Sequence, residues 1–212
     1  MPESAAEADV LWQLRDAEKR YSKRTVVRIA SLDLRDRESV ALIGSNGSGK
    51  STLLRMIAGI ATLSSGRLVQ SEAAKALRQA IVPQSGGIYP GATVRENLRI
   101  HAGMHGVDLG ANVAEAPYIT RFGLSAFMDV QASRLSGGYQ RLCAIACALC
   151  VAPSCLFMDE PYSGLDRQQT ENLNHVIETL RTKLRFLAIT GHFPESVKAG
   201  FRIVSLRNGE LQ

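Results

Sequence analysis

The sequence predicts an α/β fold built around a mostly parallel β-sheet, and three observations lead to this prediction. An apolar segment at residues 39–43 (SVALI) is followed by a glycine-rich loop and then by apolar residues at helical spacing. A second apolar segment, residues 154–160 (SCLFMDE), ends in two acidic residues, as expected of a buried strand that points toward a ligand. From residue 136 onward, predicted helices and strands alternate, which is typical of a parallel sheet covered on both faces.

The predicted elements divide the chain into three parts, which we expect to form one domain over residues 1–212. Residues 10–71 should form an antiparallel β subdomain around the first parallel strand and its helix. Turn signals at Gly86-Gly87 and Pro90-Gly91 open a small helical subdomain, expected at about residues 86–134, with a helix at residues 93–105. The elements expected after it are a helix at 139–151, a strand at 155–158, a helix at 168–183, strands at 186–189 and 202–206, and a turn at 208–209.

Composition and charge narrow the range of functions. The chain is 45% apolar and has no apolar run of about 18 residues, so no membrane span is expected. The polar N-terminal segment does not resemble a signal peptide. The net charge of +5 is modest, and basic residues do not form a stripe interleaved with aromatic ones. A nucleic acid is therefore not an expected partner.

The glycine-rich loop reads GSNGSGKST and fits the phosphate-loop pattern G-x-x-x-x-G-K-[ST] at every fixed position. Its glycines allow a tight turn whose N–H groups approach phosphate oxygens, and the helix beginning near Lys50 adds its positive end. We expect Lys50 to reach the β- and γ-phosphates of ATP and Ser51 to bind Mg²⁺, in a P-loop NTPase core. The expected ATP-binding residues of the loop are Gly44, Ser45, Asn46, Gly47, Ser48, Gly49, Lys50, Ser51 and Thr52.

Two carboxylates follow the second apolar strand, where ligands gather in open α/β sheets. Adjacent strand residues point to opposite faces, so Asp159 and Glu160 are expected to have different roles. We assign Mg²⁺ binding to Asp159, directly or through water. Glu160 would orient and polarise the attacking water, because phosphoryl transfer depends mainly on positioning and charge stabilisation.

These motifs, taken with residues 135–141 (LSGGYQR), resemble the ATP-binding cassette (ABC) family, the motor subunits of ABC transporters. LSGGYQR resembles the family signature, which is far more specific than a phosphate loop, and the likeness extends over nearly the whole chain. Further residues resemble family motifs: Gln84 the Q-loop glutamine, residues 163–166 (SGLD) the D-loop, His192 the switch histidine, and Tyr21 the aromatic residue that stacks on adenine.

The resemblance implies that two such subunits, identical or different, pair head to tail around two ATP molecules. Ser136, Gly137 and Gly138 would meet the γ-phosphate of the ATP held by the partner's loop, through a hydroxyl, N–H groups and a helix starting near Tyr139. His192 would contact the γ-phosphate. The expected catalytic residues are Lys50, Gln84, Glu160 and His192, and the expected Mg²⁺ ligands are Ser51, Gln84 and Asp159.

The resemblance therefore implies the ATP-hydrolysing subunit of an ABC transporter, with a membrane-spanning permease on a separate chain. Its expected location is cytoplasmic, at the inner face of the cell membrane. Residues 88–107 resemble exporter-type subunits, so export is expected. Two alternatives stay open: a soluble ABC ATPase, for example in iron–sulfur cluster assembly, and a nucleotide sensor without turnover.

Several positions depart from the family pattern. Arg37-Glu38 stands where Gly-Glu is common, and Gly200-Phe201-Arg202 lacks the usual acidic residue. Tyr162 and Gly191 stand where Thr or Ser is usual, and Gly191 loosens the backbone beside the switch histidine. None of these residues is an expected ligand of phosphate or Mg²⁺. Hydrolysis is still predicted, and the departures bear on its rate.

Two spacings are typical of metal sites. Cys143, Cys147 and Cys150 are spaced like radical-SAM iron–sulfur ligands, but their segment reads as a helix, which would align the sulfurs along one face. We expect these residues and Cys155 to be core residues, not cluster ligands or disulfides. His101 and His105 are spaced for zinc but lack an acidic partner motif, so a solvated helix face is expected.

Overall fold

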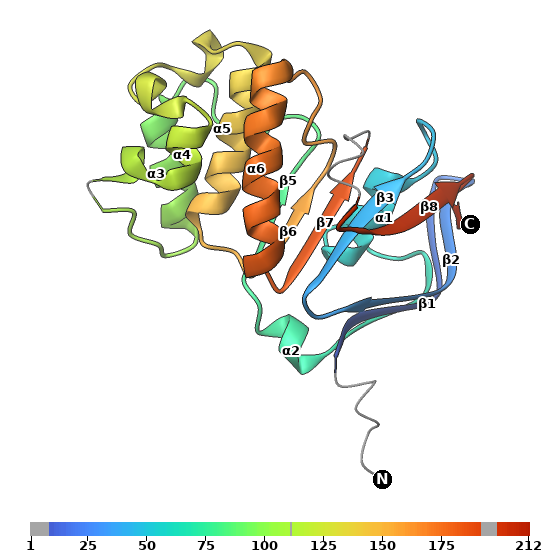
Figure 1. The fold of residues 1–212 in the computed structure, drawn as a ribbon. Helices are drawn as coiled ribbons and strands as arrows, with labels where there is room; N and C mark the ends of the chain where they lie inside the picture. The colour runs from blue at the N-terminus through green and yellow to red at the C-terminus, as the bar shows by residue number, and fades with distance from the viewer. Residues whose placement is uncertain (1–8, 111, 192–198) are drawn as a thin grey trace.

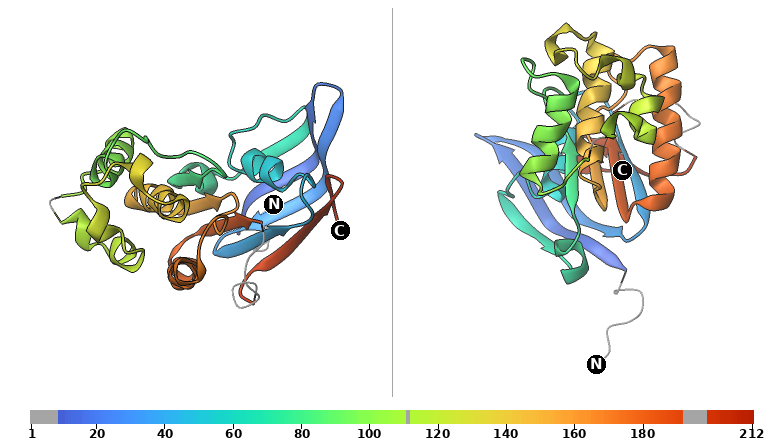
Figure 2. Two further views of the ribbon diagram at one scale, coloured as in Figure 1. Left: turned by 90° about the horizontal axis from the view of Figure 1, so that it is seen from above. Right: turned by 90° about the vertical axis from the view of Figure 1, so that its left-hand side faces the viewer.

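The computed structural model describes residues 9–110, 112–191 and 199–212, which form two β-sheets and a group of helices (Figure 1). The antiparallel sheet and the helices α3 to α6 lie on opposite sides of the larger sheet (Figure 2). The predicted α/β fold, with an antiparallel β region near the N-terminus and a helical region, is confirmed.

The larger sheet has the order β5-β6-β7-β3-β8-β9. Its first five strands run parallel, and β9 pairs antiparallel with β8. The strands are β3 (Glu38–Ile43), β5 (Gln79–Val82), β6 (Cys155–Met158), β7 (Phe186–Thr190), β8 (Arg202–Arg207) and β9 (Glu210–Leu211). Because β5, β6, β7 and β3 are neighbours and parallel, the four loops that follow them meet at one edge of the sheet.

The smaller sheet has the order β2-β1-β4 and is antiparallel. Its strands are β1 (Val10–Tyr21), β2 (Arg24–Arg35) and β4 (Ser65–Gln70). Helix α1 (Lys50–Ile57) packs between the two sheets and buries Leu53, Leu54, Met56 and Ile57 in their shared core.

The remaining helices are α2 (Glu72–Lys75), α3 (Val94–Met104), α4 (Pro117–Arg121), α5 (Gly137–Cys150) and α6 (Arg167–Lys183). Thr93 caps α3 through a capping box with Glu96, as its sequence position favours. The predicted start of α5 near Tyr139 is wrong by two residues, because Ser136 caps the helix and Gly137 and Gly138 belong to its first turn. No helix within the described ranges is long and apolar enough to cross a membrane.

Strand alternation divides the core between the two faces of the parallel sheet. Leu156 and Met158 of β6 face the cluster around α5 and α6, whereas Cys155 and Phe157 face α1 and the antiparallel sheet. Trp12 of β1 packs against Phe157 and Phe186, with ring centroids 5.9 and 4.8 Å away. This aromatic contact joins the antiparallel sheet to β6, which the acidic pair follows, and to the neighbouring strand β7.

The cysteines are free and buried, so the prediction of core residues is confirmed. Over the described ranges, no group of three or more His, Cys, Asp or Glu side chains could hold a metal ion. The prediction of a solvated histidine face is correct for His105, which is exposed just after α3. It is wrong for His101, which is half-buried 6.2 Å from the Tyr89 ring and whose pKa is lowered by burial.

A buried carboxylate fixes the β1–β2 hairpin that carries Tyr21. Glu18 accepts hydrogen bonds from Thr25 at 2.6 Å and Arg20 at 2.7 Å, and weaker ones from Ser65 and Arg28. These donors come from β1, β2 and β4. Hydrogen bonds from Arg20 and Thr25 hold the pKa of Glu18 well below its ordinary value of 4.5.

We predict that Glu18→Gln destabilises the fold in a pH-dependent way. A lowered folded-state pKa means that the carboxylate stabilises the protein above pH 4.5, and that this stabilisation is lost as the pH falls through the folded-state value. Urea unfolding should show a difference from the wild type near neutral pH that shrinks in acid. Glu72→Gln, in an exposed pair with Lys75, is the control. A difference independent of pH would contradict the prediction.

Candidate nucleotide-binding site

The phosphate loop lies between β3 and α1, as its sequence pattern requires. Its glycines adopt backbone angles that favour glycine, with φ of 149° at Gly44, 76° at Gly47 and 102° at Gly49. The Nζ atom of buried Lys50 donates to the carbonyl oxygens of Gly44 and Ser45, both at 2.9 Å. The lysine thus lies under the loop, with one of its three donors left for a ligand.

Two neighbouring segments fix the conformation of this loop. The N–H of Gly209, in the turn between β8 and β9, donates to the Ser48 carbonyl at 3.0 Å. A Cβ atom on Gly49 would lie 2.8 Å from the Val26 carbonyl oxygen, so β2 passes directly against the start of α1. Buried Ser48 has a hydroxyl with no hydrogen-bond partner within the described ranges.

A pocket of about 410 Å³ opens above the loop. It is lined by Val26, Asn46, Gly47, Gly49, Lys50, Ser51, Thr52, Gln84 and Glu160. The structure thus brings together three separate predicted motifs, and Val26 is a lining residue that sequence reasoning missed. Tyr21 does not line this pocket. It is 49% exposed at the end of β1, with the Lys19 ammonium 5.1 Å from its ring centroid.

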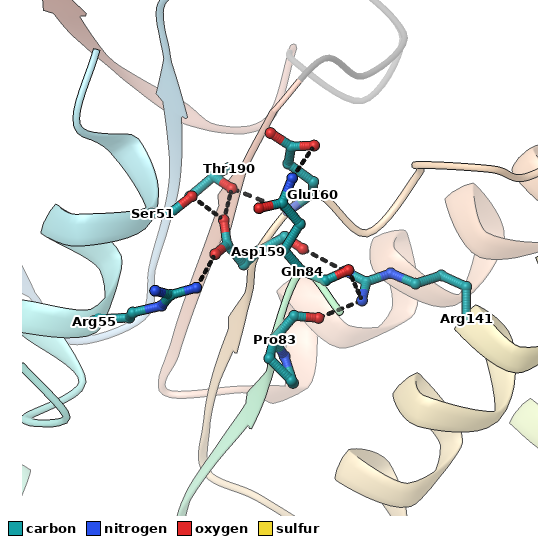
Figure 3. Close-up of polar contacts among 8 residues, drawn as sticks. All are labelled: Ser51, Arg55, Pro83, Gln84, Arg141, Asp159, Glu160 and Thr190. Atoms are coloured by element: carbon teal, nitrogen blue, oxygen red, sulfur yellow. Dashed lines mark hydrogen bonds and ion pairs between the residues drawn. The ribbon is translucent and has the colours of Figure 1, made fainter. Parts of the chain in front are cut away.

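Asp159 is the junction between the loop and two strand ends (Figure 3). Its Oδ1 atom accepts hydrogen bonds from the hydroxyls of Ser51 at 2.7 Å and Thr190 at 2.6 Å. Its Oδ2 atom pairs with Arg55 of α1 at 3.4 Å. Asp159 is fully buried, and a buried carboxylate requires such partners. Sequence reasoning missed Thr190.

Glu160 points into the pocket from a strained backbone. Its φ is 51°, which is uncommon for a residue with a side chain. Gln84, after β5, donates its side-chain N–H to Glu160 Oε2 at 3.1 Å (Figure 3). The Glu160 N–H donates to the Thr190 hydroxyl at 3.0 Å. Glu160 and Gln84, predicted from separate motifs, are therefore in contact.

Arg141 ties the LSGGYQR helix to this edge of the sheet, and sequence reasoning missed its role. Its guanidinium donates to the backbone carbonyls of Pro83 and Asp159, and to that of Gln84 at 3.4 Å (Figure 3). The side chain is buried, and burial lowers its pKa. One cation thus joins α5 to the ends of β5 and β6.

The donor set also fits Mg²⁺ bound with ATP. Ser51 and Gln84 line the pocket and offer hydroxyl and amide oxygens, which are hard ligands of the kind that Mg²⁺ prefers. Asp159 is fully buried and does not line the pocket, but it contacts the site through the Ser51 hydroxyl. Mg²⁺ usually keeps several water molecules and shares phosphate oxygens with its nucleotide, so a pocket with few carboxylates is adequate.

The sequence model of the ABC transporter family matches residues 27–163, which include the phosphate loop, Asp159 and Glu160. The chain belongs to the ABC transporter family.

Three ABC relatives match at similar identity. LnrL, a linearmycin resistance ATP-binding protein of Bacillus subtilis, is 33% identical over 88% of this chain and 62% of its own length. The Nod factor export ATP-binding protein I of Paraburkholderia xenovorans is 34% identical over 93% of this chain and 66% of its own length. The aliphatic sulfonates import ATP-binding protein SsuB of Burkholderia ambifaria is 33% identical over 99% of this chain and 65% of its own length. The chain thus spans slightly less than two thirds of the length of these relatives.

Solved ABC structures share the fold. The ATP-binding subunit of an ABC transporter superposes with a TM-score of 0.79 at 25% identity, over 95% of this chain and 88% of that chain. A nucleotide-free ATP-binding cassette superposes with a TM-score of 0.75 at 21% identity, over 95% and 89%.

The ABC signature residues lie apart from the pocket of their own chain. Ser136 and Gly137 are exposed at the start of α5, where the Ser136 hydroxyl accepts from the N–H of Tyr139 at 3.4 Å. Gly138 is buried, and a Cβ atom there would overlap Gln169 of α6. None of the three lines the pocket that contains Lys50. His192 lies outside the described residues.

Tyr162 and Gly191, which depart from the family pattern, each contact an identified neighbour. The hydroxyl of Tyr162 donates to Asn174 of α6 at 2.7 Å, and burial raises its pKa. Gly191 has a φ of 110° and packs against Glu160.

We predict that Gly49→Ala and Gly47→Ala differ sharply in stability. Both positions have a positive φ, but a Cβ atom on Gly49 would meet the Val26 backbone at 2.8 Å, whereas one on Gly47 would meet nothing within 4 Å. Gly47→Ala should cost about 1 kcal/mol of unfolding free energy, and Gly49→Ala more than about 2 kcal/mol. Urea unfolding measures both, and equal losses would contradict the steric argument.

Proposed function

We propose that this chain binds and hydrolyses ATP as the motor subunit of an ABC transporter. The observation that carries the proposal is the convergence of Lys50, Ser51, Gln84 and Glu160 on one pocket at the ends of β3, β5 and β6. Membership of the ABC family gives this pocket its expected ligand. We further propose that residues 1–212 form one ATPase domain, with a helical subdomain at about residues 86–134.

The phosphate loop would bind the triphosphate of ATP. Its backbone N–H groups and the start of α1 offer positive potential, and Lys50 would direct its remaining donor toward the β- and γ-phosphates. Ser51 can offer its oxygen to Mg²⁺ while its hydroxyl hydrogen is donated to Asp159 Oδ1 in a hydrogen bond. When bound, Mg²⁺ neutralises charge on the phosphates. Tyr21 is proposed to stack on adenine.

Glu160 would position the attacking water. Its carboxylate faces the pocket, accepts a hydrogen bond from Gln84, and can accept another from a water molecule. Deprotonation and alignment of that water beside the γ-phosphate is the step that a carboxylate can assist. His192 is proposed to contact the γ-phosphate.

The second half of each site is proposed to come from another subunit. Ser136 and Gly137 are exposed at a helix start, but they lie outside the pocket of their own chain. A head-to-tail dimer, homomeric or heteromeric, would bring them to the partner's ATP. ATP binding would then close the dimer and hydrolysis would release it, which a membrane-spanning permease can sense.

The proposed location follows from that partner: the cytoplasmic face of the cell membrane. The direction of transport stays a prediction, since export and import subunits match this chain at similar identity. The cited relatives give no support to the iron–sulfur alternative.

We predict that Glu160→Gln binds ATP with nearly wild-type affinity but hydrolyses it more than about 100-fold more slowly, because it loses the water-positioning carboxylate. Fluorescent-nucleotide binding and steady-state phosphate release measure the two effects. The variant should also form ATP-dependent dimers in light scattering. Wild-type hydrolysis by Glu160→Gln would contradict the role of this residue.

A mixing experiment tests the shared site. Lys50→Ala and Ser136→Arg should each abolish hydrolysis when present alone. Both sites of a Lys50→Ala dimer lack the lysine, and both sites of a Ser136→Arg dimer lack the serine. In an equal mixture, a heterodimer would hold one intact site and one doubly altered site, so about a quarter of the wild-type rate should return. Failure to recover any hydrolysis, with both variants folded and exchanging subunits, would contradict the head-to-tail arrangement.

A further inference from the structure

We propose that Thr190, at the end of β7, is a positioning residue for hydrolysis, because its one hydroxyl orients both members of the acidic pair. This inference rests on the proposed ATPase function and assigns a role to a residue outside the motifs described above. Gly191, the next residue, completes the arrangement by leaving room for Glu160.

The hydroxyl of Thr190 lies between two consecutive residues of the neighbouring strand end (Figure 3). It donates its hydrogen to Asp159 Oδ1 at 2.6 Å and accepts the Glu160 N–H at 3.0 Å. Thr190 is fully buried, so solvent does not compete for either bond. A hydroxyl has one hydrogen to donate, and here Asp159 receives it.

The two bonds act on different parts of the acidic pair. The bond to Oδ1 fixes the side chain of Asp159, on the same oxygen that receives Ser51. The bond from the Glu160 N–H fixes a backbone whose φ of 51° is otherwise unfavourable. Without an acceptor at this place, that N–H would lose its partner, and the Glu160 backbone could relax toward a commoner conformation.

Gly191 sets the space beside Glu160. A Cβ atom on Gly191 would lie 3.1 Å from Glu160 Cγ and 3.3 Å from Glu160 Cα. Its φ of 110° is also unfavourable for any other residue. Glycine at position 191, where the family usually has Thr or Ser, therefore leaves the space that the observed orientation of Glu160 toward the pocket requires.

The hydroxyl is the group to test, and Thr190→Val removes it while nearly preserving shape. A displacement of about 1 Å at a reacting group can lower a rate about 100-fold. We expect kcat for ATP to fall between about 10-fold and 100-fold, with nucleotide affinity in the absence of Mg²⁺ changed less than about 3-fold. Thr190→Ser retains the hydroxyl and should restore most of the rate.

Two controls separate positioning from general stability. Thr179→Val makes the same substitution on the exposed face of α6 and should leave kcat unchanged. In a Glu160→Gln background, Thr190→Val should lower the residual rate by a smaller factor than in the wild type, because the part of its effect that acts through the Glu160 carboxylate is already lost. If Thr190 merely stabilised the fold, Thr190→Val would lower the hydrolysis rate by the same factor in the wild-type and Glu160→Gln backgrounds.

The outcomes are distinguishable. If the wild-type chain hydrolyses ATP, Glu160→Gln does not, and Thr190→Val equals the wild type, the inference on Thr190 is overturned while the proposed function stands. Absence of hydrolysis by the wild type, in dimers that bind ATP, overturns the proposed function itself. Should Thr190→Val fail to fold, Thr190→Ala carries the test, because it also removes the hydroxyl: a lower kcat with retained nucleotide affinity supports the inference, and an unchanged kcat overturns it.

Discussion

The carboxylate of Asp159 lies where the phosphate-loop helix meets the ends of two parallel strands, and it is fully buried. A buried anion is stable only when donors surround it. Here those donors are Ser51 and Arg55 of α1 and Thr190 of β7, while Arg141 of α5 binds the backbone carbonyl of the same residue. These partners come from three elements, α1, β7 and α5, so the contacts of this one residue fix the relative positions of the phosphate loop, the strand ends and α5.

The two faces of the parallel sheet that carries Asp159 are both covered by packed elements. Alternating strand residues bury one face of the sheet against α1 and the antiparallel strands, with Trp12 packed on Phe157 and Phe186. The other face packs against α5 and α6. The aromatic contact and the buried Arg141 therefore support the acidic pair from opposite faces of the sheet. The edge between them holds charged groups in fixed contacts, and preorganised charge of this kind favours phosphoryl transfer.

Local residue patterns predicted the parts of the site that depend on sequence neighbours. The phosphate loop and the acidic pair could be found because each is a short run with its own chemistry, placed at a strand end. Thr190, Arg141 and Val26 could not, since their roles come from approaches between segments far apart in the chain. The early start of α5 was missed because glycine disfavours helix, whereas the Ser136 cap and close packing of Gly138 on α6 override that preference.

A double-mutant cycle between Ser51→Ala and Thr190→Val tests the central claim most directly, because both hydroxyls donate to the same oxygen of Asp159. Urea unfolding of the wild type, both single variants and the double variant gives the coupling free energy. Residues that share one hydrogen-bond network couple by about 0.5 kcal/mol or more, and we predict a value in that range. Simple additivity of the two losses would contradict the account of Asp159 as the common acceptor.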